Sequence, residues 1–161
     1  MSRRLTELLR EARARLSDAP RERFGDLQEG RRLLGIPRPA RIATRGLAWH
    51  LGVLLLTDDD VLATGDIVRS RAEVRRGFAA ESQRRRAELA AAAARGGVPE
   101  GETVHIGWTV LDPDGLSARS VPLAVRGGDV LVRWSAAGGY MPLGRYLDER
   151  IELLRHPPER A

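Results

Sequence analysis

The sequence lacks cysteine, lysine and asparagine, and aromatic residues make up only 4% of its 161 residues. Without cysteine, disulfides, thiolate metal sites and thiol nucleophiles are excluded. Without lysine, a Walker A phosphate loop, a Ser–Lys nucleophile and a lysine Schiff base are excluded as well. Because large aromatic side chains are scarce, leucine, valine and alanine must fill most of the core.

Long apolar runs are also missing. The longest run of large apolar residues, Val53–Leu56, is far shorter than the roughly 18 residues that a membrane-spanning helix needs. The opening residues, MSRRLTELLREARARL, are charged throughout and do not have the apolar centre of a signal peptide. We therefore expect a cytoplasmic protein with no membrane partner.

All 27 basic residues are arginine, and they are unevenly placed. Residues 1–45 hold 12 arginines and 6 acidic residues, whereas residues 46–161 hold 15 and 16. Five arginines lie around Pro37 and Pro39, which favour extended backbone. They form a candidate nucleic-acid-binding arm: Arg31, Arg32, Arg38, Arg41 and Arg45. The alternative is a solvated surface, since no aromatic residue alternates with them to stack on bases.

Three segments have helical patterns. Leucines and alanines at helical spacing predict an amphipathic helix over Arg3–Leu16, and a similar stripe follows Pro142 as far as Leu154. Glu81–Arg95 contains six alanines and ends before two glycines, which predicts a third helix that lies against a sheet. Residues 18–30 have no clear period and are interpreted as a loop, and residues 70–80 as an exposed connection.

The stretch from Leu51 to Val68, LGVLLLTDDDVLATGDIV, predicts the central hairpin of a sheet. Its first strand, Trp49–Thr57, is apolar at both odd and even positions, so both of its faces should be covered. Val61–Arg69 is the predicted returning strand, Thr103–Leu111 a half-buried linking strand, and Arg41–Thr44 a short edge strand.

A second hairpin has a predictable register. If Gly127 and Gly128 form a two-residue turn, the opposed pairs are Arg126 and Asp129, Val125 and Val130, Leu123 and Val132, and Val121 and Trp134. The expected fold is α+β, with an antiparallel sheet of about five strands, a packed central helix and flanking N- and C-terminal helices. We expect a single domain, in which residues 1–45 form a basic helix and arm, 46–155 the core and 156–161 a tail. The second face of the central strand must be covered either by the terminal helices or by a second copy of the chain, so a homodimer is one of two expectations.

His105 is the candidate catalytic residue, because it lies in a predicted strand with Asp66 or Glu102 as a neighbouring carboxylate. The alternative is a structural histidine. Three consecutive aspartates, residues 58–60, could bind a hard cation. Consecutive side chains point in different directions, however, so a hairpin turn is favoured, and we expect neither a metal nor a cofactor.

Several segments resemble a known group of proteins: RLLGIPR at 32–38, Leu51–Leu56 with the ATG at 63–65, RGG at 95–97 and EGETV at 100–104. The group consists of short, mostly uncharacterised proteins from high-GC bacteria, some labelled glutaminase, and the resemblance covers about residues 31–106. It implies an amidohydrolase. Serine glutaminases, however, resemble β-lactamases and use a Ser-x-x-Lys nucleophile, which a chain without lysine does not have.

Three functional hypotheses follow. The first is a small non-catalytic binding or interaction module, because no complete catalytic motif is present. The second is nucleic-acid contact through the basic N-terminal segment. The third is an amidohydrolase with His105 in its site.

Overall fold

The computed structural model describes residues 3–73, 77 and 80–159, and these residues form three helices and mostly antiparallel strands, which confirms the α+β class. The predicted connection at 70–80 lies partly outside them. Contacts group the chain into two compact units. Unit 1 comprises Met1–Arg21, Ala48–Thr64 and Thr109–Ala161, and unit 2 comprises Glu22–Leu47 and Gly65–Trp108.

The main sheet differs from the expected one. Among the described residues it has seven strands in the order β7-β8-β1-β4-β5-β6-β9, and it is mixed, since β1 and β8 are parallel. One added strand is β1 (Glu22–Gln28), in the segment interpreted as a loop. Its neighbour β4 (Arg41–Leu51) is an 11-residue strand rather than a short edge strand. The expectation of about five antiparallel strands was therefore wrong.

Breaks in the long predicted strands account for the remaining difference. Trp49–Thr57 is interrupted at Gly52, whose φ of 67° begins a tight turn between β4 and β5. Thr103–Leu111 is interrupted at Gly107, where φ is 68°. Glycine adopts this left-handed backbone without steric cost, so a strand pattern that contains it can end there.

Unit 1 contains two helices and the end of β4. Its elements in chain order are α1 (Arg3–Arg15), β5 (Leu54–Leu56), β6 (Val61–Ala63), β9 (Thr109–Val110), β10 (Leu123–Arg126), β11 (Asp129–Arg133), β12 (Tyr140–Pro142) and α3 (Leu143–Arg155). The predicted helices at both ends of the chain are confirmed. So is the register from Leu123↔Val132 to Arg126↔Asp129, while Val121 and Trp134 lie beyond the paired residues.

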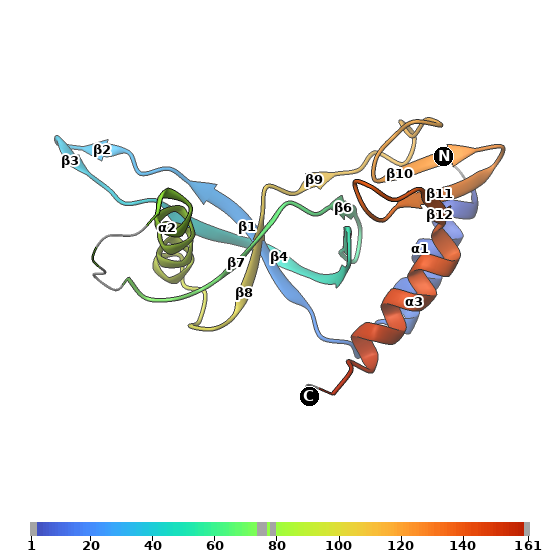
Figure 1. Ribbon diagram of the computed structural model, residues 1–161, viewed down its shortest axis with the longest axis horizontal. Helices are drawn as coiled ribbons and strands as arrows, with labels where there is room; N and C mark the ends of the chain where they lie inside the picture. The colour runs from blue at the N-terminus through green and yellow to red at the C-terminus, as the bar shows by residue number, and fades with distance from the viewer. Residues whose placement is uncertain (1–2, 74–76, 78–79, 160–161) are drawn as a thin grey trace. The chain divides into compact units, whose positions relative to one another are not determined.

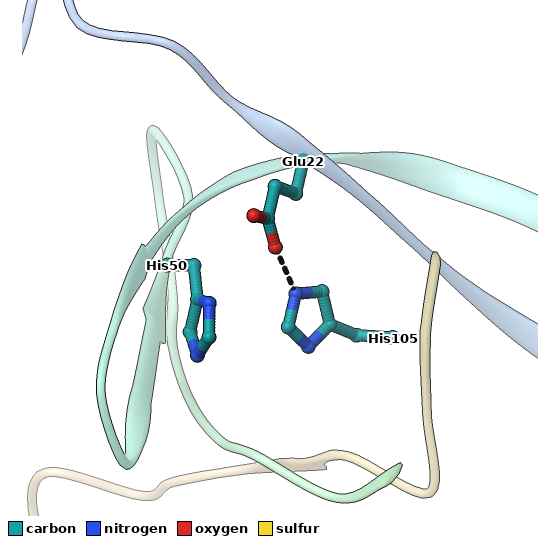
Figure 2. Close-up of side chains that lie close together, drawn as sticks. All are labelled: Glu22, His50 and His105. Carbon is teal, nitrogen blue, oxygen red and sulfur yellow. Dashed lines mark hydrogen bonds and ion pairs between the residues drawn. The ribbon is translucent and has the colours of Figure 1, made fainter. Parts of the chain in front are cut away.

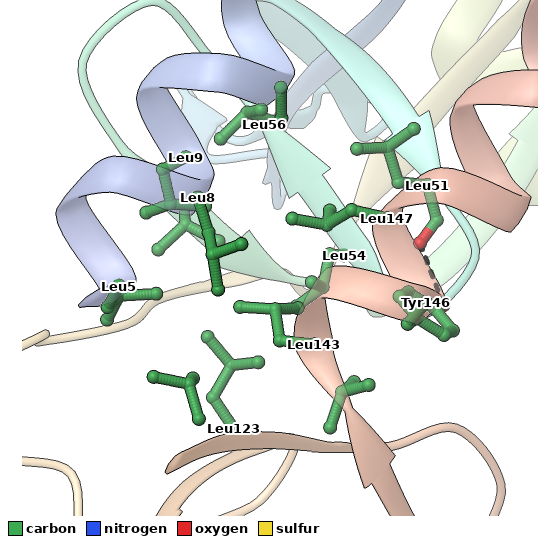
Figure 3. Close-up of a cluster of buried hydrophobic side chains, with 14 of the residues drawn as sticks. Leu5, Leu8, Leu9, Leu51, Leu54, Leu56, Leu123, Leu143, Tyr146 and Leu147 are labelled. Carbon is green, nitrogen blue, oxygen red and sulfur yellow. Dashed lines mark hydrogen bonds between the residues drawn. The ribbon is translucent and has the colours of Figure 1, made fainter. Parts of the chain in front are cut away.

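The core of unit 1 is built mainly from leucine (Figure 3). Leu5, Leu8 and Leu9 of α1 pack with Leu54 and other side chains of the strands and α3. The helical spacing of those α1 residues places them on one face, which is why the pattern was readable in the sequence. Tyr146 adds a polar anchor, because its hydroxyl donates to the Leu51 carbonyl and accepts from the Val53 amide, each at 2.8 Å.

The central strand is covered on both faces. Leu54, Leu55 and Leu56 are each at most 1% exposed in the single chain. Successive side chains of a strand point to opposite faces, so burial at all three positions means that neither face is open to water. A second copy of the chain is not needed to cover it, and the homodimer stays a prediction.

Unit 2 contains the start of β4 together with β1, β2 (Arg32–Leu33), β3 (Ile36–Pro37), β7 (Asp66–Arg69), α2 (Glu81–Arg95) and β8 (Thr103–Ile106). The predicted Glu81–Arg95 helix is confirmed. Its N-terminal half is exposed, and Ala91, Ala92 and Ala93 are buried. The backbones approach closely at its end, where a Cβ at Gly96 would lie 1.7 Å from the Ile42 carbonyl oxygen.

The β2–β3 hairpin continues beyond the ends of β1 and β4 and extends past α2 (Figure 1). We call residues 30–41 the arm. Among the described residues, no helix is both long and apolar enough to cross a membrane.

Candidate functional site

The arm ends in a two-residue turn of unusual composition. Leu33 is paired with Ile36, so Leu34 and Gly35 form the turn, with φ values of 54° and 77°. Two consecutive positive φ values are the pattern of a type I′ turn, in which asparagine or glycine usually precedes the glycine. Among the described residues, Leu34 is the one non-glycine residue with a positive φ. A leucine there is strained, because its Cβ crowds the backbone.

Three apolar side chains are exposed at this turn. Leu33, Leu34 and Ile36 have exposed fractions of 53%, 96% and 68%. We call these three residues the arm tip. Single exposed apolar residues are common, whereas a contiguous group makes the arm tip a candidate interaction surface.

Arginines lie directly behind the arm tip. Arg31, Arg32, Arg38 and Arg41 are exposed and, within the described residues, make no ion pair or side-chain hydrogen bond. Arg45, the fifth arginine of the predicted nucleic-acid segment, differs. Its guanidinium is paired with Asp26 at 3.0 Å. The structure therefore places four of the five predicted arginines on the arm and the fifth in a local ion pair.

A glycine allows the two sides of the arm to approach. A Cβ at Gly30 would lie 1.4 Å from the carbonyl oxygen of Arg38, a distance that no side chain can occupy. Gly30 therefore positions the hairpin relative to β1 and β4 through backbone contact. The arm therefore continues the pair of strands β1 and β4 as a hairpin with close backbone contact at its base.

His105, the predicted catalytic residue, is fully buried in β8. Its Nε2 lies 2.5 Å from the Glu22 carboxylate of β1 (Figure 2). The parallel register opposes Phe24 to His105, and Glu22 lies on the same face as Phe24, two residues earlier. A carboxylate beside an imidazole is half of a general-base site, but a ring with no exposed surface does not reach a substrate in this conformation.

The two carboxylates proposed as partners of His105 are placed elsewhere. Asp66 is exposed at the start of β7, opposed to Ile106. Glu102 forms an ion pair with Arg23. The partner that the structure provides, Glu22, lies in the segment interpreted as a loop, so its proximity to His105 could not be inferred.

The aspartate run forms a hairpin turn between β5 and β6, as predicted. The Thr57 hydroxyl accepts from the amides of Asp59 and Asp60, and Arg21 donates two hydrogen bonds to Asp58. The hydrogen bond from Arg21 is the main cause that holds the pKa of the Asp58 carboxyl below its usual value. Arg21 also lies over the ring of Trp49, 3.8 Å from its centroid.

Unit 1 has an open depression of about 430 Å³. Its wall is mainly apolar, with Val53, Val121 and Pro122 among its residues, and the polar side chains include Thr64 and Arg133. The Arg133 guanidinium already donates to the carbonyl oxygen of Ala136. The depression therefore offers few directed polar groups with which to select a ligand.

The remaining two histidines make local contacts. His50 Nε2 lies 3.0 Å from the carbonyl oxygen of Gly52, and His156 Nε2 lies 3.9 Å from Glu152, four residues earlier at the end of α3. Both contacts are to groups close in sequence.

The arm tip was missed by sequence reasoning. The arginines and prolines of the RLLGIPR segment indicate a basic, extended stretch, and nothing in their pattern marks the three apolar residues among them. The available signal was the pair Leu34-Gly35, since a glycine between two short extended segments favours a hairpin. Whether the leucines would be exposed was not readable from sequence.

Comparison of this chain with protein-family models, with curated proteins and with solved structures finds no match. The resemblance to glutaminase-labelled proteins therefore stays an expectation.

Proposed function

We propose that the protein is a small non-catalytic binding module that engages its partner through the arm tip. The observation that carries the proposal is Leu34, which is 96% exposed and held at a φ of 54°. An exposed leucine contributes little to folding, and the left-handed backbone costs about 1–2 kcal/mol. A residue that is both strained and exposed suits a role in binding better than one in stability.

The arrangement of the arm supports this proposal. Gly30 lets the two sides of the arm approach closely at its base, because its backbone packs against the Arg38 carbonyl. A preordered hairpin presents Leu33, Leu34 and Ile36 together, so little conformational entropy is lost when a partner covers them. A few residues near the centre of a contact often supply most of its binding energy.

The amidohydrolase hypothesis has one observation in its favour, the short contact between His105 and Glu22. Catalysis by this pair would also need a nucleophile or water within reach and a path for the substrate. The ring of His105 is fully buried. Purified protein should therefore show no glutamine hydrolysis in an ammonia-release assay, and turnover that His105→Ala abolishes would contradict the proposal.

A photo-crosslinking amino acid placed at position 34 tests the binding role without assuming a partner. The matched control carries the same amino acid at Leu153, which is 49% exposed on α3. Irradiation in living cells should give adducts from position 34 that are absent at position 153. Equal adduct yields at the two positions would overturn the proposal.

A further inference from the structure

We infer that the partner of the arm is an anionic lipid membrane, with the arm tip inserted among the lipid chains and the arginines behind it at the phosphates. This inference rests on the proposed function and names its partner. Side-chain character changes in order along the arm, from apolar at its end to basic behind it. Leu34 lies at the end, Leu33 and Ile36 form the next pair, and Arg32 follows opposite Pro37.

The same order is found on crossing a membrane surface. Hydrocarbon lies innermost, and the charged phosphates lie just outside it. A strand advances about 3.3 Å per residue, so Arg31 and Arg32 lie within about 7 Å of Leu33 along the arm. That spacing lets guanidinium groups contact phosphates while the aliphatic side chains enter the hydrocarbon boundary, which lies about 5–10 Å deep for surface-bound segments.

Charge complementarity supports an anionic partner. Unit 2 contains 14 arginines and 9 acidic residues, whereas unit 1 contains 13 of each. The whole net charge of +5 therefore belongs to the unit that carries the arm. Each basic residue near an anionic membrane strengthens binding by about fivefold.

The number of exposed aliphatic side chains favours lipid over nucleic acid. Proteins that wedge apolar side chains into duplex DNA insert them between individual base steps. Here three branched side chains are exposed together, two of them as a cross-strand pair. Among the described residues of the arm no aromatic ring is available to stack on bases. A hydrocarbon layer accommodates all three at once, whereas a base step does not.

The absence of a long apolar run does not bear on this kind of contact. A membrane-spanning helix needs about 20 apolar residues, whereas a surface contact needs a few apolar side chains with basic residues beside them. The expectation of no membrane partner followed from the missing apolar run and the missing signal-peptide pattern, neither of which a surface contact requires.

Vesicle flotation with the full chain tests the inference. Vesicles of phosphatidylcholine alone are compared with vesicles that also contain phosphatidylglycerol. We expect binding to the mixed vesicles that weakens at high salt. Leu34→Asn should reduce the partition coefficient by about tenfold, because burying one leucine contributes at least that factor.

Leu34→Asn is designed to keep the fold. Asparagine before glycine is the preferred pair in a type I′ turn, so the arm should be retained. The matched control, Leu153→Asn, makes the same chemical change at an exposed leucine of α3 and should leave vesicle binding unchanged. Thermal denaturation of both variants checks that they are folded.

A second variant tests the arginines. Arg31→Gln combined with Arg32→Gln should reduce binding to mixed vesicles by about 25-fold, five for each charge. The control removes two exposed arginines of unit 1, Arg10 and Arg119, by the same substitution. An equal loss in the two double variants would show that net charge alone attracts the membrane, and would overturn the inference.

Three further outcomes would overturn the inference. The first is binding to mixed vesicles that Leu34→Asn leaves intact, and the second is no vesicle binding at all. The third is Leu34-dependent binding to duplex DNA without vesicle binding, which would assign the arm to nucleic acid. In each case adducts specific to position 34 would keep the proposed binding role, so failure of the lipid inference and failure of the function are distinguishable.

Discussion

The two units of this chain differ in the size of the apolar residues that they bury and in their charge. Unit 1 buries large leucines between two helices and its strands, and its arginines and acidic residues are equal in number. Unit 2 packs a helix through small alanines and carries the net positive charge. It also exposes Leu33, Leu34 and Ile36 together at one turn, whereas exposed apolar residues of unit 1, such as Val110 and Leu153, lie on separate elements. The proposed binding role assigns contact with a partner to unit 2, and it predicts that substitutions in the core of unit 1 act mainly on stability.

The glycines show the same contrast. In unit 1, Gly52 forms a turn that Tyr146 fastens by hydrogen bonds to the residues on either side of it. In unit 2, Gly30 and Gly96 permit backbone approach to Arg38 and Ile42. All three positions depend on the missing side chain of glycine, but Gly52 faces a tyrosine hydroxyl, whereas Gly30 and Gly96 face backbone carbonyls.

The largest effect should come from making a cavity in unit 1. Leu54→Ala should lower the free energy of unfolding by about 2–5 kcal/mol, because a fully buried leucine loses both transfer energy and packing. Urea denaturation measures it. Leu153→Ala, at an exposed position, is the control and should change stability by less than about 0.5 kcal/mol. Equal effects at both positions would contradict the proposed core.

Unit 2 should be most sensitive to the opposite change. Ala93→Leu should lower the free energy of unfolding by about 1–3 kcal/mol, because α2 has no room for a larger side chain at a fully buried alanine. The control is Ala87→Leu on the exposed part of the same helix, which should be nearly neutral. If Ala93→Leu is tolerated as well as Ala87→Leu, then close packing of small side chains does not distinguish unit 2 from unit 1.

The arm tip should respond in the other direction. Leu34→Asn should raise the free energy of unfolding by about 1 kcal/mol, because asparagine tolerates the left-handed backbone that strains leucine. Ile36→Asn is the control, since Ile36 is exposed without a positive φ, and it should give no gain. Thermal denaturation distinguishes the two. A stability loss in Leu34→Asn would show that Leu34 serves folding rather than binding.

The smallest effect concerns pH and the turn of unit 1. A carboxyl whose pKa is lower in the folded state contributes stability above its unfolded pKa and loses it as pH falls through the folded pKa. Asp58→Asn should therefore lower the melting temperature slightly at pH 7, and the difference from the native protein should vanish in acid. The pair is exposed, so the effect is small. Asp59→Asn is the control. The same pH dependence in that variant would show that the hydrogen bond from Arg21 to Asp58 is not its cause.

Local patterns predicted several elements well. The three helices and the turn at Gly127–Gly128 follow from spacing, alanine content and glycine placement, which act within a few residues. Strand identity was less readable. The segment at 22–28 shows no alternation of apolar and polar residues, and of its seven residues only Gly25 is buried, so period two did not reveal β1. The predicted strands end at Gly52 and Gly107, where the backbone turns, and a glycine within a strand pattern does not by itself say whether the strand ends there.

The candidate sites show the same limit. His105 and the arginines of the arm were identifiable by residue type. The contact between His105 and Glu22 joins positions 83 residues apart, through a parallel pairing that no local pattern specifies. The exposure of Leu34 depends on the absence of packed neighbours, a property of the whole fold.

The sequence by itself determined the helices, the second hairpin and the chemistry that this protein does not have, because those depend on residue type and short-range spacing. Tertiary structure decided which apolar residues are buried. It placed the leucines of LGVLLL in a core and those of RLLGI at an exposed turn. The two stretches are similar in composition, and only long-range pairing separates a residue that stabilises the fold from one that is available to a partner.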